Sequence, residues 1–85
     1  MLTKRITIKN AGGLHALKAA QLKVLAQNFE SDSFLRKGTE SASCRHLTSL
    51  LALGVKQGET ITVYCDGTDQ TKALEAISGF LTQAR

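Results

Sequence analysis

Apolar and polar residues follow two different rhythms along this chain, and each rhythm predicts a type of element. Period-two alternation rich in β-branched residues is typical of strands, whereas apolar positions three and four residues apart indicate amphipathic helices. The elements expected are strands at 2–8, 33–37, 40–44 and 60–65, and helices at 15–29, 47–53 and 73–84. Their order is strand, helix, strand, strand, short helix, strand, helix.

The same pattern predicts which side chains are buried. Ile6 and Ile8 share one face of the first strand, and Ile61, Val63 and Cys65 share one face of the last. Each long helix carries a single apolar stripe. The stripes are Ala19, Leu22, Leu25, Ala26 and Phe29 in the first, and Ala73, Leu74, Ile77, Phe80, Leu81 and Ala84 in the second. We therefore expect an α+β fold with helices covering one face of a four-stranded, mostly antiparallel sheet.

Glycine marks the breaks between these elements, and the chain contains no proline. Gly38 lies in a short connection that suits a hairpin, and Gly54 can end the short helix in a left-handed conformation. Thr68 or Asp69 is suited to cap the last helix. With 85 residues and no repeat or linker, we expect one domain over residues 1–85.

The composition is that of a folded globular chain, with 42% hydrophobic and 21% charged residues. Lys and Arg outnumber Asp and Glu by 11 to 7, so the net charge of +4 favours an anionic partner. The basic residues are dispersed and the four aromatic residues are scattered. We therefore expect neither a nucleic-acid-binding arm nor a base-stacking platform, and no nucleic-acid partner.

No targeting segment or metal site is expected. The residues after Arg5 alternate instead of forming an apolar block, and no run approaches the ~20 residues of a membrane span. We therefore expect a cytoplasmic protein without direct membrane insertion. Cys44 and Cys65 lack C-x-x-C spacing and are interpreted as reduced thiols, at least one of them buried. Cys44 and His46 alone supply too few ligands for a metal.

The chain's clearest candidate for chemistry is Gly12-Gly13-Leu14-His15, which runs directly into the first long helix. An imidazole there lies beside the unpaired N–H groups of the first helical turn, those of Ala16, Leu17 and Lys18. The partial positive charge of a helix N-terminus stabilises a phosphate and keeps more of the imidazole neutral. Phosphoryl transfer depends largely on such positioning and positive potential. The alternative is a plain capping histidine; the segment is neither a Walker motif nor a dinucleotide fingerprint.

Several motifs together resemble a known family. They are Gly13-Leu14-His15, Ala19-Ala20-Gln21, Ser41-Ala42-Ser43, Leu47, Leu50, Leu53-Gly54, Gly58 and Asp66-Gly67. In register over nearly the whole chain, they are similar to the histidine-containing phosphocarrier proteins (HPr) of the bacterial sugar phosphotransferase system. The resemblance implies a βαββαβα open-faced sandwich. It also implies that Nδ1 of His15 accepts a phosphoryl group from the phosphoenolpyruvate-charged enzyme I and passes it to IIA proteins. Such a protein is a carrier that needs no cofactor.

The active loop departs from the family pattern at two positions. The family reads Gly-Leu-His-Thr/Ala-Arg-Pro, whereas this chain has Leu17 where the phosphate-clamping arginine stands and Lys18 in place of proline. Leu17 offers only its backbone N–H, and Lys18 restores a charge but not the planar guanidinium fork. Because one lost transition-state contact typically costs several kcal/mol, we expect slower or weaker transfer.

Outside the active loop, the chain departs from the family pattern at His46, the position of the regulatory serine that many family members carry. Without a hydroxyl, control by phosphorylation of that serine cannot operate, and the plain interpretation of His46 is a cap or surface residue. The resemblance also implies a docking face. Its expected members are Leu47 and Leu51 at an apolar centre with Arg45, Lys18 and Lys23 at the rim, whereas Leu50 is expected in the core.

Two hypotheses remain open, because the histidine is retained while the arginine is lost. The first is a monomeric phosphocarrier with His15 as the acceptor, held by residues 16–18. The second is a degenerate regulatory binding module that docks partner proteins without phosphotransfer. A small nucleic-acid binder is the weakest interpretation, since the chain has no G-x-x-G loop or aromatic strand signature of that class.

Overall fold

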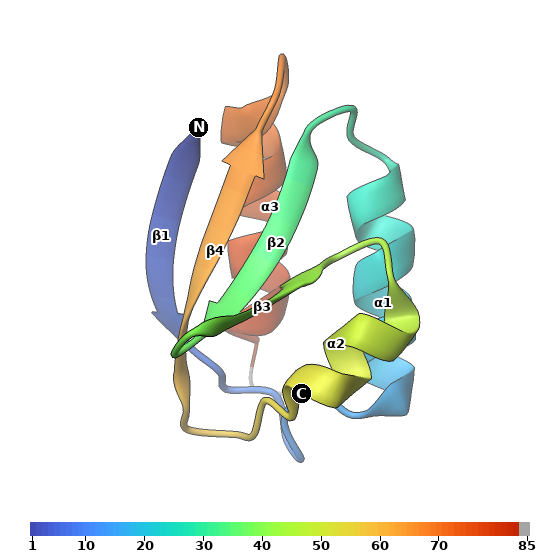
Figure 1. Ribbon diagram of the computed structural model, residues 1–85, viewed down its shortest axis with the longest axis vertical. Helices are drawn as coiled ribbons and strands as arrows, with labels where there is room; N and C mark the ends of the chain where they lie inside the picture. The colour runs from blue at the N-terminus through green and yellow to red at the C-terminus, as the bar shows by residue number, and fades with distance from the viewer. Residues whose placement is uncertain (84–85) are drawn as a thin grey trace.

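A computed structural model describes residues 1–83 of the chain. The strands form one sheet in the order β1-β4-β2-β3, and every neighbouring pair is antiparallel. The three helices lie on one face of this sheet (Figure 1). The elements are β1 (Leu2–Thr7), α1 (Ala16–Gln27), β2 (Asp32–Lys37), β3 (Glu40–Ser43), α2 (Leu47–Leu53), β4 (Thr60–Asp66) and α3 (Gln70–Leu81).

This order confirms the predicted βαββαβα open-faced sandwich, with small differences at the ends of elements. Helix α1 ends at Gln27, so Phe29 of the predicted stripe lies in the loop that follows. Helix α3 begins at Gln70, directly after the expected cap position Asp69, and ends at Leu81. Ala84, the last predicted member of its stripe, lies outside the described residues.

The core lies between the sheet and the helices. The expected strand residues Ile6, Ile8, Ile61, Val63 and Cys65 are all buried. From the helices, the buried members of the stripes are Ala19, Leu22, Ala26, Ala73, Ile77 and Leu81, with Leu25, Phe29, Leu74 and Phe80 partly buried against them. Each large aliphatic side chain buried in this way contributes roughly 1.5–3 kcal/mol. One stripe per helix is therefore enough to fix the helices on one face and leave the other face uncovered.

The side-chain cap predicted at the start of α3 is wrong. Asp69 occupies the N-cap position, but its carboxylate makes no capping hydrogen bond. It instead accepts the backbone N–H groups of Glu30 and Ser31, both at 2.9 Å, and the Ser31 hydroxyl. These bonds lower the pKa of Asp69, the Ser31 hydroxyl most of all. The carboxylate thus ties the loop between α1 and β2 to the start of α3, a contact that local sequence does not indicate.

Both cysteines are buried and free, in agreement with the expectation of reduced thiols. Ser33 of β2 lies between them, in register with Cys65 of β4 and accepting the N–H of Cys44 through its carbonyl at 3.0 Å. Burial raises the pKa of Cys44 to about 12, so this thiol stays protonated at neutral pH. Among residues 1–83, no helix is both long and apolar enough to cross a membrane.

Candidate functional site

The loop between β1 and α1 is held against the segment that follows α2. Gly13 has a φ of +72°, and a Cβ built on it would lie 2.6 Å from the Val55 carbonyl oxygen. Leu14 is buried, and its N–H donates to the same carbonyl at 3.0 Å. Only glycine combines this conformation with this close approach. The backbone of the loop that precedes His15 is therefore fixed against Val55.

Asn10 fixes the other side of the same loop. Its buried side-chain amide donates to the carbonyl oxygens of Phe80 at 3.2 Å and Gln83 at 2.8 Å, at the C-terminal end of α3. Its backbone carbonyl accepts the N–H of Gly13 at 2.9 Å. The loop is thus attached to α3 as well as to Val55, which limits the movement of the residue that follows it.

His15 is the N-cap residue of α1, with an extended backbone at φ −81° and ψ 179°. Its carbonyl oxygen accepts the N–H of Ala19 at 2.8 Å, the first bond of the helix. The imidazole makes no capping bond and is exposed. A Cβ on Gly12 would lie 3.3 Å from Cδ2 of the ring, so this edge of the imidazole faces Gly12.

The first turn of α1 creates an electropositive environment beside that ring. The N–H groups of Ala16, Leu17 and Lys18 have no intrahelical acceptor, as at the start of any helix. No acidic side chain stands in this turn. With twelve residues, α1 presents partial positive charge at this end. An exposed nucleophilic ring next to free amide donors suits a phosphoryl group.

The side chains of Leu17 and Lys18, both in this turn, lie in different environments. Leu17 is 61% exposed, so an apolar side chain projects into solvent two residues after His15. The Lys18 amine lies 5.7 Å from the centre of the Phe80 ring of α3, within the range of a cation–π contact. The predicted role of Lys18 as a phosphate ligand thus stays a prediction, because its amine is positioned over the ring of Phe80.

The expected apolar docking residues lie on α2, which packs against α1. Leu51 is 40% exposed, Leu47 is partly buried against the core, and Leu50 is fully buried as expected. Val24 of α1 is 61% exposed and was not predicted to belong to the docking face. Its position off the apolar stripe of α1 was the available signal, because an apolar residue on the polar side of a helix indicates an exposed contact.

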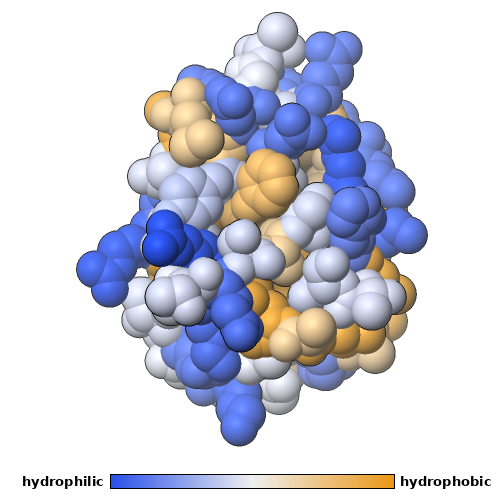
Figure 2. Space-filling view, in the orientation of Figure 1, coloured by the Kyte–Doolittle hydropathy of each residue, from blue (hydrophilic) through white to orange (hydrophobic). Residues whose placement is uncertain are grey.

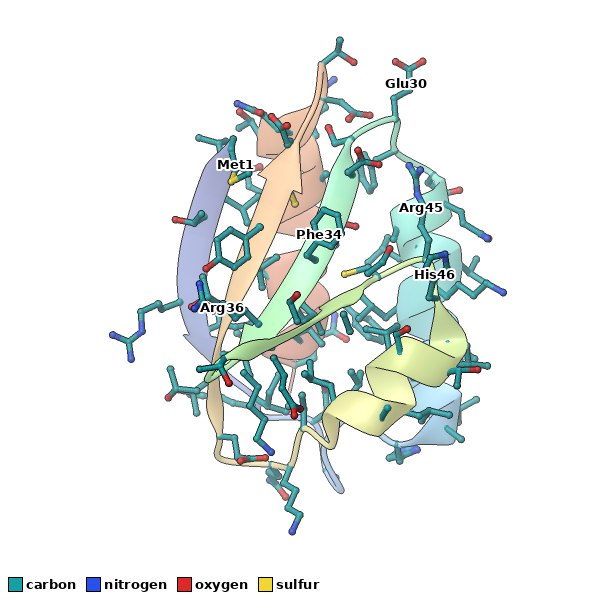
Figure 3. The ribbon with its side chains drawn as sticks, viewed as in Figure 1. Met1, Glu30, Phe34, Arg36, Arg45 and His46 are labelled. Atoms are coloured by element: carbon teal, nitrogen blue, oxygen red, sulfur yellow. The ribbon has the colours of Figure 1, made fainter. Side chains whose placement is uncertain are left out.

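The basic residues expected at the rim differ in their contacts. Lys23 is partly buried on α1. The guanidinium of Arg45 donates to the carbonyl oxygens of Phe29 at 2.6 Å and Ser31 at 3.2 Å. It also lies 3.8 Å from a carboxylate oxygen of Asp32, so its charge is directed toward the loop between α1 and β2 (Figure 3). The docking roles of both residues stay predictions.

His46 is the N-cap residue of α2 and, like His15, is exposed without a side-chain capping bond. Its N–H donates to the Ser43 carbonyl at 3.1 Å, and its carbonyl accepts the N–H of Leu50 at 3.0 Å. Figure 3 shows it beside Arg45. Over the described part of the chain, no group of three His, Cys, Asp or Glu side chains could hold a metal ion.

Comparison with known proteins identifies the family. Residues 2–83 match the family described as "PTS HPr component phosphorylation site". Phosphocarrier protein HPr from Lysinibacillus sphaericus is 32% identical over 83 residues, covering 98% of this chain and 94% of that protein. Phosphocarrier protein NPr from Shewanella violacea is 38% identical over 76 residues, covering 89% of this chain and 84% of that protein.

Solved structures agree with this match. The phosphocarrier protein HPr from Bacillus anthracis superposes with a TM-score of 0.92 at 27% identity, covering 95% of this chain and 96% of that one. This chain belongs to the HPr family of phosphocarrier proteins. The resemblance inferred from the sequence is therefore confirmed, and membership supports a phosphocarrier role in the phosphotransferase system.

Proposed function

We propose that His15 accepts a phosphoryl group from enzyme I and passes it to IIA-type components of sugar transport. The observation that supports this most strongly is the exposed imidazole at the N-cap of a twelve-residue helix whose first turn holds no acidic side chain. The lone pair of Nδ1 attacks phosphorus, and the bond between phosphorus and the donor breaks as the P–N bond forms. The reverse exchange delivers the group to the acceptor.

The first helical turn holds the transferred group in this proposal. The phosphoryl oxygens accept the backbone N–H groups of Ala16, Leu17 and Lys18, which are already oriented and need no rearrangement. The pinned loop supports this role, because Gly13 and Asn10 fix the backbone on which the imidazole stands. The exposure of the imidazole supports the approach of a phosphoryl donor to Nδ1.

Transfer is expected to be slower than in relatives that carry the arginine of the family pattern. Leu17 supplies no side-chain donor to the phosphoryl oxygens, and Lys18 contacts Phe80. Removing one donor from a preorganised anion site typically costs about 3 kcal/mol in the transition state. The amide groups and the helix end supply the remaining stabilisation.

Partner docking uses the exposed apolar residues of α1 and α2 in this proposal. Leu17, Val24 and Leu51 are exposed, and Leu47 lies partly buried with them on the helical side of the molecule. Because these side chains are apolar, the partner should present an apolar surface to them. Lys23 of α1 should face an acidic group of the partner. In this proposal the protein acts as a monomer in the cytoplasm.

A phosphorylation assay tests this function. The protein is incubated with phosphoenolpyruvate and enzyme I, and its mass is followed before and after acid or base treatment. We expect a gain of one phosphoryl group that is labile in acid, stable in base and absent from His15→Ala. The proposal fails if the parent protein gains no mass.

A phosphorylation-independent binding module is the second candidate. The observations that favour it are the exposed Leu17 at the clamp position and the contact of Lys18 with Phe80. It predicts that IIA-type or regulatory partners bind the protein with equal affinity whether residue 15 is histidine or alanine. A partner affinity that changes on phosphorylation of His15 would exclude this candidate.

A further inference from the structure

The face of the sheet that the helices leave uncovered carries an apolar centre. Phe34 of β2 and Tyr64 of β4 are direct cross-strand partners on this face, and Phe34 is 38% exposed. Viewed onto this face, Figure 2 shows apolar atoms near the middle of the sheet with hydrophilic side chains around them. Figure 3 places Met1, Phe34 and Arg36 there. An apolar centre with a polar rim is the arrangement of a contact surface, and an aromatic ring supplies such a centre with a large contact area.

Two adjoining hollows lie on this face, and both are lined by Arg36 and Tyr64. One is mainly polar and also contains a second arginine. Its lining is Arg5, Arg36, Gly38, Thr60, Ile61, Thr62 and Tyr64. The other is mainly apolar. Its lining is Met1, Phe34, Arg36, Thr39, Ser41 and Tyr64. A ligand with an anionic group next to an apolar one matches the lining of both hollows.

The two arginines are available to an anion. Neither Arg5 nor Arg36 forms an ion pair with an acidic residue in the part of the chain that is described. Arg36 donates from Nε to the Gly38 carbonyl at 2.9 Å and from Nη1 to the Tyr64 hydroxyl at 3.4 Å. These bonds orient the guanidinium and leave further N–H groups for a carboxylate, which arginine binds in a bidentate manner.

The opposite end of the face selects against a polyanion. Asp32 and Asp66 are cross-strand partners there. Each lies near one cation, Asp32 at 3.8 Å from Arg45 and Asp66 at 3.3 Å from the N-terminal amine of Met1. A continuous phosphate backbone crossing the sheet would meet these carboxylates. An isolated carboxylate placed over Arg5 and Arg36 would not.

We propose that this open face is a second docking site, which binds a partner-protein segment carrying a carboxylate beside a bulky apolar side chain. The carboxylate lies between Arg5 and Arg36, and the apolar side chain packs against Phe34, Tyr64 and Met1. The flexible thioether of Met1 adapts to the shape of that side chain. Because His15 lies at a helix end and the helices cover the other face of the sheet, this site can be occupied while His15 is phosphorylated.

The test begins with selection from a random dodecapeptide library on the immobilised full-length protein. We expect enriched sequences to combine Asp or Glu with an adjacent Phe, Leu, Ile or Met. The best peptide is then labelled with fluorescein, and its dissociation constant is measured by fluorescence anisotropy. Amide chemical shifts measured in the same titration should change in β2 and β4 and stay unchanged in α1 and α2.

Matched variants separate this site from non-specific attraction to a basic protein. Arg36→Ala and Arg5→Ala should each weaken peptide binding about tenfold, as expected for a lost charge-assisted hydrogen bond. Lys72→Ala removes the same charge from an exposed position of α3 and should leave the dissociation constant unchanged. Phe34→Ser should weaken binding, whereas Val24→Ser, an equivalent apolar loss on α1, should not. His15→Ala should bind the peptide normally, which separates this site from phosphotransfer.

Several results would overturn the proposal. They are the absence of any enriched peptide, enrichment of sequences without an acidic residue, and an equal loss of affinity in Lys72→Ala and Arg36→Ala. If a fluorescein-labelled oligothymidylate binds this face more tightly than the peptide, the ligand of this site is a single-stranded nucleic acid and the proposed acidic peptide is wrong. The side chain of Arg5 forms no hydrogen bond or ion pair within the described residues, so Arg5→Ala should fold and keeps the test informative if Phe34→Ser unfolds.

Discussion

The two histidines of this protein occupy equivalent positions, since each is the exposed N-cap residue of a helix and neither imidazole caps it. Their surroundings differ. His15 follows a loop that Gly13 and Asn10 fix against Val55 and α3, and it begins a helix of twelve residues. His46 follows a strand and begins a helix of seven. Under the proposed function, the loop that positions His15 and the longer helix behind it are what distinguish this N-cap from that of His46.

Exchanging each histidine for alanine should produce the largest contrast. His15→Ala is expected to abolish phosphorylation by enzyme I and phosphoenolpyruvate, because the only proposed acceptor nitrogen is removed. His46→Ala should be phosphorylated at the parental rate. Intact-mass spectrometry over a time course measures both. Phosphorylation that survives in His15→Ala and disappears in His46→Ala would reverse the assignment.

Adding one methyl group to a loop glycine should show how much the contact between this loop and Val55 contributes to the free energy of unfolding. Gly13→Ala forces a Cβ to 2.6 Å from the Val55 carbonyl at a φ of +72°, so we expect a loss of about 3 kcal/mol in the free energy of unfolding. Gly54→Ala, at the end of α2, also has positive φ but meets open space and should cost about 1 kcal/mol. Urea unfolding measures both values. Equal losses would show that the loop is not held by this contact.

Restoring the arginine of the family pattern should accelerate transfer. In Leu17→Arg the guanidinium can reach the phosphoryl oxygens, and we expect a rate increase of about tenfold or more. Thr48→Arg adds the same charge at the equivalent position of α2, two residues after His46, and serves as the matched control. If both variants react at the parental rate, either Lys18 already supplies this stabilisation or residue 17 does not face the phosphate.

The smallest effect is expected from removing the charge of Asp69, whose carboxylate holds the loop between α1 and β2. The folded-state pKa of Asp69 lies below its ordinary value of 3.8, so its stabilisation is complete above that value and is lost as the pH falls through the folded-state pKa. Asp69→Asn should therefore be less stable than the parent at neutral pH, and the difference should shrink toward pH 3. Thermal unfolding across this range measures it, while phosphorylation of His15 should not change. A difference independent of pH would contradict the assigned cause.

Periodicity in the sequence predicted the order of the elements and most of the core, because burial on one face imposes a period of two on strands and 3.6 on helices. The same periodicity predicted that His15 lies at the start of the first long helix. The contacts of Asp69 could not be predicted, because its partners lie 38 and 39 residues away in the chain. The cation–π contact of Lys18 with Phe80 and the pairing of Phe34 with Tyr64 also depend on the packing of distant elements.

The most direct measurement is a nitrogen-15 NMR spectrum of the protein before and after treatment with enzyme I and phosphoenolpyruvate. If the first turn of α1 holds a phosphoryl group on His15, the Nδ1 resonance of that ring shifts, and the amide resonances of Ala16, Leu17 and Lys18 shift with it. The corresponding amides after His46 stay in place. Phosphorylated protein in which the three α1 amides do not move would contradict the account.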